Sequence, residues 1–294
     1  MIVKLFLVVL TVILSPTFIS AFQFNRDFLL SQRLAASADG PLAWSDCVDI
    51  NNAELLQKLK RKKSRAGRTK RSAFFLNVHG RENFKRLCKD LSTVEKNAII
   101  FLCETWTVQA KSSPLFPSKD HFVVHADKHT KGRPFGGLEI YVSRHLQAQE
   151  RSKSPHHIAI DVGSTSLIGV YYRPSLELDD VITDLSRAIT SCGNQDEIIL
   201  SGDFNIQYGT PDYVELEEFV DSCGLSLRSD PSIATFFNGN HAGHSTPDHL
   251  FASRMIDMPS CIVGDLHASD HEPIIATFKT ARKLKAFPFS KTSL

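Results

Sequence analysis

Apolar and polar positions follow two different periods along the chain from residue 72 onwards. Short apolar runs between turn-forming residues predict buried strands at 73–78, 98–103, 138–142, 167–172, 197–200 and 274–278, with further strands around 235, 249–252 and 262. Apolar residues three and four positions apart predict amphipathic helices at 81–91, 178–189 and 210–223. Strands alternating with helices indicate an α+β fold. We expect four layers, α/β/β/α, with two packed mixed sheets inside and helices outside.

Two further stretches have a residue composition that is informative about local structure. Thr210 supplies a capping side chain, Pro211 suits the first helical position, and Asp212 places an acid in the first turn, so a helix is predicted to begin here. Residues 119–133 are rich in His and Lys and predict an exposed loop or a short hairpin.

The first residues, 1–21, predict a secretory signal peptide. Lys4 precedes a ten-residue apolar run, Ser15-Pro16 interrupts it, and Ser20-Ala21 offers small residues for cleavage. The run is too short for a membrane span, although an N-terminal anchor is the alternative. We therefore expect a secreted monomer without stable membrane association.

Residues 22–71 resemble a propeptide that ends in a basic linker. The stretch 58–71 carries nine positive charges and no acid, so it is expected to be solvated. It could contact nucleic acid phosphates, act as a nuclear-localisation run, or be cut before Ser72, because Arg68-Thr69-Lys70-Arg71 resembles a proprotein-convertase site. The catalytic domain is expected over 72–280, followed by a basic tail over 281–294.

Composition and cysteine content say little about the class of protein or its partners. The 294 residues are 42% hydrophobic and 22% charged, as in ordinary globular proteins, and a net charge of +2 says little about partners. Some of the six cysteines could pair in an oxidising compartment. Buried free thiols are the alternative for Cys88, Cys103 and Cys223, which lie on predicted apolar faces.

Two short polar stretches carry the candidate chemistry. Ser201-Gly202-Asp203-Phe204-Asn205 follows a predicted buried strand, and Asp203 and Asn205 are two apart, so on an extended backbone they point to the same side. Ser269-Asp270-His271 adds an acid and an imidazole directly before the last apolar strand. Acids, an amide and an imidazole at strand ends predict a metal-assisted hydrolytic site. Each stretch taken alone could be a solvated turn.

Further motifs occur in order along the chain, and together they resemble the endonuclease/exonuclease/phosphatase superfamily, which has a DNase-I-like fold. The resemblance covers residues 73–279 and is carried by Leu76-Asn77-Val78, Cys103-Glu104-Thr105-Trp106, Tyr172-Arg173-Pro174, Ser201-Gly202-Asp203-Phe204-Asn205, Thr246-Pro247-Asp248-His249 and Ser269-Asp270-His271. Within the superfamily, the sequence most resembles the endonuclease domain of non-LTR (LINE-type) retrotransposons. Three motifs carry this resemblance: Glu104-Thr105-Trp106, Tyr171-Tyr172-Arg173-Pro174, and Ala234-Thr235-Phe236-Phe237 followed by Ser245-Thr246-Pro247-Asp248-His249. The resemblance describes such a domain standing alone behind a signal peptide.

The resemblance implies a role for each matching residue. The metal side, with Mg²⁺ or alternatively Mn²⁺, would comprise Glu104, Asn77 and Asp270. The catalytic groups would be Asp203, Asn205, His271, Asp248 and Tyr172. Thr235 and Arg173 would contact the substrate. Structural explanations remain for Asn77 as a turn cap, for the Glu104 stretch as a loop around a packing tryptophan, and for Tyr172 as a surface aromatic.

The function implied is that of a secreted Mg²⁺-dependent endonuclease that hydrolyses DNA phosphodiester bonds, with nucleic acid as its partner. Two alternatives stay open: a secreted phosphoesterase on a lipid or inositol phosphate, and a catalytically silent endonuclease domain acting as a secreted venom or salivary effector. Two residues depart from the pattern of the superfamily. His79 stands near the expected metal site, and Pro247 removes a backbone donor immediately before Asp248.

Overall fold

The fold is taken from a computed structural model, which describes residues 69–108, 113–128, 132–193, 196–238 and 244–280. The expected signal peptide, most of the propeptide-like segment, Cys47 and the basic tail lie outside the described residues. Among the helices that are described, none has both the length and the apolar character needed to cross a membrane.

The first sheet has six strands, in the order β13-β14-β1-β2-β4-β3. Their bounds are Asp257–Val263 (β13), Ile274–Thr280 (β14), Thr69–Asn77 (β1), Ile99–Cys103 (β2), Leu138–Ser143 (β4) and Lys119–Val124 (β3). The β1–β2 pair is parallel and its neighbouring pairs are antiparallel. The sheet is therefore mixed, with one parallel pair at its centre.

The second sheet repeats this plan with the order β5-β6-β7-β8-β12-β9. Its strands are Ala148–Lys153 (β5), His157–Val162 (β6), Thr165–Tyr171 (β7), Ile198–Asp203 (β8), Asp248–Ser253 (β12) and Leu225–Leu227 (β9). Its parallel pair is β7–β8. A separate two-stranded ribbon joins Phe236–Phe237 (β10) to His244–Ser245 (β11).

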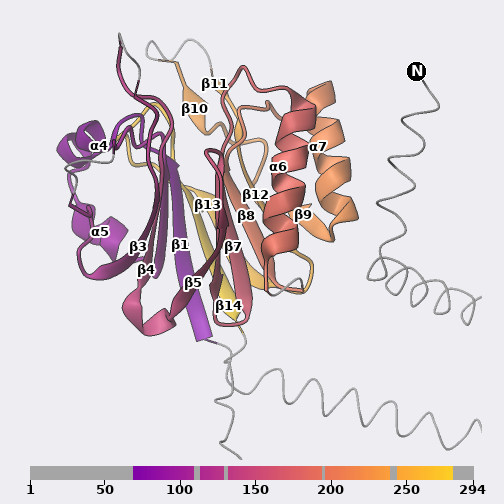
Figure 1. Ribbon diagram of the computed structural model, residues 1–294, viewed down its shortest axis with the longest axis horizontal. Coiled ribbons are helices and arrows are strands. Elements are labelled where there is room, and N and C mark those ends of the chain that lie inside the picture. Colours follow the sequence, from indigo (N-terminus) through magenta and orange to yellow (C-terminus); the bar gives the residue numbers. More distant parts are fainter. Residues whose placement is uncertain (1–68, 109–112, 129–131, 194–195, 239–243, 281–294) are drawn as a thin grey trace, which may run out of the picture. The chain divides into compact units, whose positions relative to one another are not determined.

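Helices cover the outer faces of both sheets, which confirms the predicted layered α+β sandwich. Helices α4 (Arg81–Leu87) and α5 (Leu91–Glu95) lie beside the first sheet, and α6 (Leu178–Ser191) and α7 (Pro211–Ser222) lie beside the second (Figure 1). A 3₁₀ helix, η1 (Arg144–Leu146), follows β4. The predicted cap of α7 is present, because the Thr210 hydroxyl accepts the Tyr213 N–H at 3.3 Å.

The single helix predicted over 81–91 is two helices. Cys88 adopts an extended conformation (φ −69°, ψ 105°), which ends α4. Asp90 then starts α5, because its side chain accepts the Thr93 N–H at 3.1 Å. The apolar spacing fits helical residues on both sides of this break, but a helix-capping aspartate in the middle competes with helix continuation.

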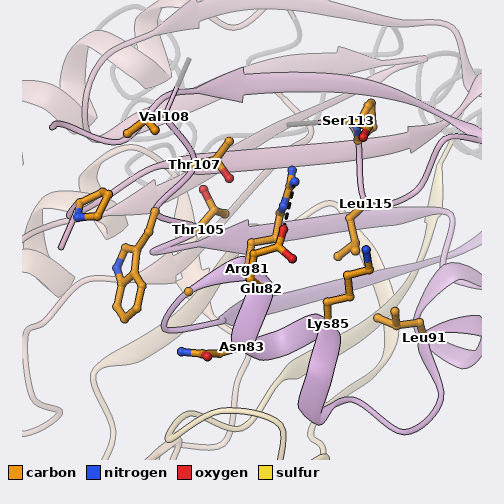
Figure 2. Close-up of a pocket in the computed structure, with 14 residues that line it drawn as sticks. Arg81, Glu82, Asn83, Lys85, Leu91, Thr105, Thr107, Val108, Ser113 and Leu115 are labelled. Carbon is orange, nitrogen blue, oxygen red and sulfur yellow. Dashed lines mark ion pairs between the residues drawn. The ribbon is translucent and has the colours of Figure 1, made fainter. Parts of the chain in front are cut away.

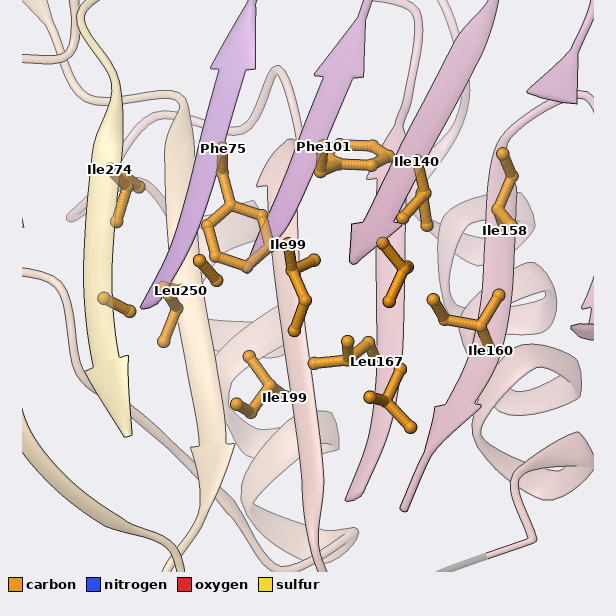
Figure 3. Close-up of a cluster of buried hydrophobic side chains, with 14 of the residues drawn as sticks. Phe75, Ile99, Phe101, Ile140, Ile158, Ile160, Leu167, Ile199, Leu250 and Ile274 are labelled. Carbon is orange, nitrogen blue, oxygen red and sulfur yellow. The ribbon is translucent and has the colours of Figure 1, made fainter. Parts of the chain in front are cut away.

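Three buried clusters correspond to the three contacts between layers. The cluster between the two sheets includes Phe75, Phe101 and Ile140 from the first sheet and Leu167 and Ile199 from the second (Figure 3). A second cluster joins the other face of the β5–β9 sheet to α6 and α7. A third joins the first sheet to α4 and α5. Both faces are covered over the middle of each sheet, so central strands such as β1, β2 and β7 are mainly apolar.

Five strands are absent from the strands that the apolar pattern predicts: β3, β5, β6 and the short β9 and β11. Residues 119–124, within the stretch predicted as an exposed loop or a short hairpin, form the mostly half-buried strand β3, whose first three residues are polar and whose last three are apolar. Strand β5 lies at the sheet edge and is mostly exposed, which explains its polar sequence. Strand β6 is fully buried, although it contains His157 and Asp161.

Two further expectations concern the chain start and the cysteines. Strand β1 begins at Thr69, which pairs with Thr280, so the expected cut before Ser72 would fall within a sheet strand. Cys88, Cys103, Cys192, Cys223 and Cys261, the five cysteines in the described residues, are all free thiols.

Candidate active site

Strand ends from both sheets meet at one edge and supply the polar side chains. In the first sheet Asn77 pairs with Cys103 in parallel register, so Asn77 and the following Glu104 emerge at the same edge. In the second sheet Tyr171 pairs with Asp203 in parallel, and Asp248 pairs with Asp203 from the antiparallel β12. Parallel strands that end together place their terminal residues side by side, which is why residues far apart in sequence converge.

Asp203 lies at the centre of this group and connects the two sheets. Its Oδ2 accepts the side-chain amides of Asn77 at 2.9 Å and Asn205 at 3.1 Å, and its Oδ1 accepts the Asn205 N–H at 2.9 Å. The side chain is 1% exposed. Burial, followed by the negative charge of Asp248, raises the pKa of Asp203 to about 7. Asp203 can therefore exchange a proton near neutral pH.

His271 and Asp248 form a buried pair next to Asp203. Nδ1 of His271 lies 2.8 Å from Oδ2 of Asp248, and the Thr235 hydroxyl donates to the same oxygen at 2.7 Å. Burial alone would lower the pKa of His271, but the charge and hydrogen bond of Asp248 outweigh it and raise this pKa to about 10. His271 is therefore an imidazolium at neutral pH, and its Nε2 is the nitrogen not engaged by Asp248.

Glu104 follows β2 in a left-handed conformation, with φ of 50°. The Tyr171 hydroxyl donates a hydrogen bond to its Oε1. Burial and the charge of Glu104 raise the pKa of Tyr171, so this phenol stays protonated and remains a donor. The carboxylate of Glu104 is half-buried and has an oriented partner.

Asp270 is bound to the unusual residue His79. Nδ1 of His79 lies 2.6 Å from Oδ2 of Asp270, and its Nε2 lies 3.1 Å from Nη1 of Arg133. The hydrogen bond that His79 donates to the Asp270 carboxylate raises the pKa of His79. Burial alone would raise the pKa of Asp270, but His79 outweighs it and lowers that pKa. Asp270 is therefore a charged carboxylate that already has a partner.

Tyr172 does not join the site, and the neighbouring Tyr171 does. Tyr172 is fully buried on the helix-facing side of its sheet, and its hydroxyl lies 3.2 Å from Oδ2 of Asp184 on α6. Strand residues alternate between faces, so only one of two adjacent tyrosines can point to the inter-sheet side. The contacts of Tyr172 with site residues come from its backbone: its N–H donates to the Asp203 carbonyl at 3.0 Å, and its carbonyl accepts the Asn205 side-chain amide at 2.8 Å.

The structure brings most of the remaining expected residues to this edge. Thr235 is buried against Asp248, and Arg173 lies over the Phe135 ring with Cζ 5.2 Å from the ring centroid. Pro247 has no N–H, but its carbonyl accepts the Phe204 N–H at 3.1 Å. The pairing of β12 with β8 can therefore begin directly after this proline. The motif at the end of β7 contains Tyr171, but the resemblance implied the role for Tyr172, and no motif contains Arg133. Strand alternation and a loop crossing bring Tyr171 and Arg133 to this edge.

Backbone strain is concentrated at the same edge. Non-glycine residues with φ of 44–54° include His79 (44°), Glu104 (50°), Trp106 (54°) and Asn205 (52°). Such conformations cost about 1–3 kcal/mol each and persist where surrounding contacts enforce them. Gly202, just before Asp203, could not be replaced easily, since a Cβ there would lie 2.0 Å from the Val170 carbonyl oxygen.

The oxygen donors at this edge fit a divalent cation, whereas His271, as an imidazolium, cannot be one of its ligands. Ligand atoms of Asp203, Asp248 and His271 lie within 4.8 Å of one another, and all three residues are buried. This group and a mostly exposed one, Asp265, His267 and Glu272, are the groups of three close enough to share an ion among the described residues. Neither contains Glu104 or Asp270, which hydrogen-bond to Tyr171 and His79 instead. The nearby carboxylates and amides offer the oxygen ligands that Mg²⁺ or Mn²⁺ prefers.

Comparisons with known proteins point to one group of enzymes. The model of a family described as endonuclease-reverse transcriptase matches residues 165–275. No curated protein sequence matches the chain significantly.

Among solved structures, the endonuclease domain of TRAS1, a telomere-specific non-LTR retrotransposon, is similar at 14% identity and a TM-score of 0.56, over 74% of this chain and 100% of that one. An AP endonuclease from Archaeoglobus fulgidus matches at 13% identity and a TM-score of 0.56, over 70% and 98%. The AP endonuclease LMAP from Leishmania major matches at 11% identity and a TM-score of 0.56, over 72% and 88%.

These likenesses agree with the two six-stranded mixed sheets and their outer helices. The chain has the DNase-I-like fold, and its resemblance to the endonuclease/exonuclease/phosphatase superfamily, including the non-LTR retrotransposon endonucleases, is confirmed.

Proposed function

We propose that this chain is a Mg²⁺-dependent endonuclease that hydrolyses phosphodiester bonds of DNA by attack of water. One observation carries the proposal: Asp203, Asp248 and His271 form a buried acid–acid–imidazole group at the edge where Glu104 and Tyr171 also meet. The similar solved structures, whose titles describe endonucleases, support the same reaction class.

The side chains divide the reaction between them. Asp203, with a pKa of about 7, accepts the proton of the attacking water, while Asn77 and Asn205 keep its carboxylate oriented. His271 is a cation whose free Nε2 can donate to a non-bridging phosphate oxygen, which stabilises the negative charge that grows there. Asp248 and Thr235 hold the imidazole in that orientation. Tyr171 orients the Glu104 carboxylate.

A bound Mg²⁺ would polarise the phosphate and neutralise charge near the leaving oxygen. Glu104, Asn77 and Asp270 remain the residues proposed to hold it. Asp270 would then have to exchange part of its contact with His79 for the cation, because both use the same carboxylate.

Nicking of supercoiled plasmid tests the reaction directly. We expect relaxation with Mg²⁺ and none with EDTA. Asp203→Ala and His271→Ala should each lower the rate about 10²–10⁴-fold, the usual range for a lost proton-transfer or charge-stabilising group.

Glu218→Gln on the exposed face of α7 is the matched control, because it also removes an acidic charge but lies on a helix outside the site. Plasmid that stays intact with folded wild-type protein in Mg²⁺ and in Mn²⁺ would contradict the proposal.

We also propose that the protein is secreted, on the basis of the leader-like residues 1–21. Expression of the full chain in a secreting cell should place it in the culture medium, with an N-terminus after residue 21 or after Arg71. Retention of the uncleaved chain in the cell would reject this.

A further inference from the structure

Two arginine side chains lie on aromatic rings on either side of Glu104. Cζ of Arg133 is 4.5 Å from the centroid of the Trp106 ring. Cζ of Arg173 is 5.2 Å from the centroid of the Phe135 ring. Cation–π pairs occur about once per 70–80 residues in proteins, so two of them mean little by number. Their shared position next to the candidate active site is the informative feature.

One short segment, 133–137, builds both pairs. It crosses the loop after β2, where the N–H groups of Thr105 and Trp106 donate to the carbonyls of Gly137 at 3.2 Å and Gly136 at 3.0 Å. Arg133 and Phe135 thus lie on the same crossing segment, and each pairs with a residue next to an expected site residue. The crossing fixes the spacing of the two pairs around Glu104.

The Arg133–Trp106 pair is held in place from several directions. His79 packs its edge against the Trp106 ring, with centroids 4.9 Å apart at 85°. Gly80 lies directly under the ring, because a Cβ there would be 2.6 Å from a ring carbon. The Trp106 ring is therefore a fixed support for the exposed Arg133 guanidinium, and only one Arg133 nitrogen is used by His79.

Hollows extend from the site on both sides. A cavity of about 370 Å³ is lined by Arg133, His79, Arg86, His267 and Asp270, among others. Trp106 and Asn83 also line a neighbouring cavity of about 690 Å³, which Lys85 borders (Figure 2). On the other side, a small hollow is lined by Arg173, Phe135, Tyr171, His125 and His156. Basic side chains thus border two hollows that also touch site residues, Asp270 in the first and Tyr171 in the last.

We propose that the Arg133–Trp106 and Arg173–Phe135 pairs bind the backbone phosphates that flank the reacting phosphate of a polynucleotide strand. This inference rests on the proposed function and specifies its substrate: a chain with phosphates on both sides of the scissile bond. A guanidinium stacked on a ring uses its face, so its N–H edge stays free for a phosphate. The aromatic ring limits the motion of the arginine and so lowers the entropy lost when the phosphate binds.

A salt series of DNA binding tests the two pairs separately from catalysis. A labelled DNA duplex is titrated with full-length protein in EDTA, where no cleavage is expected, and the dissociation constant is followed by fluorescence anisotropy at several salt concentrations. The logarithm of the association constant falls linearly with the logarithm of the salt concentration, and each lost phosphate contact makes this slope shallower by about 0.9. Arg133→Ala and Arg173→Ala should each show this reduction and bind about tenfold more weakly near 0.1 M salt, and the double variant should lose about twice the slope.

Three further variants make the result specific. Arg187→Ala, on the exposed face of α6, removes the same charge outside the site and should leave the slope unchanged. Arg133→Lys and Arg173→Lys keep the charge and should retain the slope. Slopes that stay at the wild-type value in both alanine variants, or that fall equally in Arg187→Ala, would overturn the inference.

The outcome is independent of the nicking assay. If wild-type protein nicks plasmid but Arg133→Ala and Arg173→Ala have the same salt slope as Arg187→Ala, this inference is wrong and the proposed function still stands. Protein that nicks nothing, yet loses slope specifically in Arg133→Ala and Arg173→Ala, would remove the proposed reaction and leave the binding surface standing.

Discussion

Adjacent residues at the end of β7 have entirely different environments. Tyr171 points between the sheets to Glu104, and Tyr172 points to α6 and Asp184. Asp184 also binds His157, with 2.8 Å between Oδ2 and Nδ1. Tyr172 thus belongs to a buried polar network behind the sheet, which contributes to stability, whereas Tyr171 contacts an expected metal ligand.

Substitution of each tyrosine by phenylalanine separates these roles. Tyr171→Phe removes the donor that orients Glu104 and should lower the nicking rate about 10- to 100-fold, as expected for about 1–3 kcal/mol of lost hydrogen bonding to a charged group. Tyr172→Phe should lower the free energy of unfolding by about 1–3 kcal/mol and leave the nicking rate of the folded protein close to wild type. Nicking rates and urea unfolding of both variants check this, and a larger rate loss in Tyr172→Phe would contradict it.

At the scale of elements, one close contact between the two sheets is that of Gly169 of β7 with the Phe101 ring of β2. A Cβ at Gly169 would lie 2.1 Å from the Phe101 ring. The aromatic ring therefore occupies the space that a side chain on β7 would need. Interiors packed at this density tolerate little added volume, so this contact sets the distance between the sheets.

Gly169→Ala should lower the free energy of unfolding by about 1–3 kcal/mol through overpacking. Phe101→Leu in the same chain should recover part of this loss, because the smaller side chain frees the space, so the two changes are non-additive. Gly202→Ala is the comparison, since its clash is with a backbone carbonyl and no side-chain change relieves it. Additive effects of Gly169→Ala and Phe101→Leu in urea unfolding would show that the contact is not as described.

At the scale of the whole domain, one fully buried carboxylate joins elements on the outer side of the first sheet. Glu139 of β4 accepts hydrogen bonds from Thr107 at 2.8 Å and Arg81 of α4 at 3.4 Å, and also from the Tyr141 hydroxyl. Burial alone would raise the pKa of Glu139, but its neighbours, His121 and Tyr141 foremost, lower it from 4.5 to about 2. The folded state therefore holds Glu139 as a carboxylate far below the pH at which the unfolded chain would protonate it.

The sign of the pH dependence follows from this lowered pKa. The Glu139 carboxylate contributes about 3 kcal/mol to the free energy of unfolding; this contribution is fully present above pH 4.5 and is lost as the pH falls towards 2. Urea unfolding between pH 2.5 and 6 should therefore show a stability loss on acidification that is smaller in Glu139→Gln, with Glu218→Gln behaving as wild type. Equal slopes for all three proteins would contradict the assignment.

Much of the fold and site could be predicted from local sequence. Buried strands are apolar runs because both faces of each sheet are covered, and α7 starts at Thr210 because its cap is encoded in adjacent residues. The ordered motifs located Asp203, Asn205, Asp248 and His271, which the structure brings together. Local chemistry suffices here because each signal involves residues close together in the chain.

Other features depend on contacts that no local pattern contains. The alternation of β7 decides that Tyr171, and not Tyr172, meets Glu104. The packing of the two sheets decides that Asn77 of β1 touches Asp203 of β8. The raised pKa values of the buried side chains of Asp203 and His271 depend on neighbours that come from other parts of the chain. Arg133 reaches His79 only because segment 133–137 crosses the loop after β2. Sequence alone thus identified the polar groups, whereas packing of the two sheets determined their partners, their charge states and the surface around them, because burial and long-range proximity exist only in the folded chain.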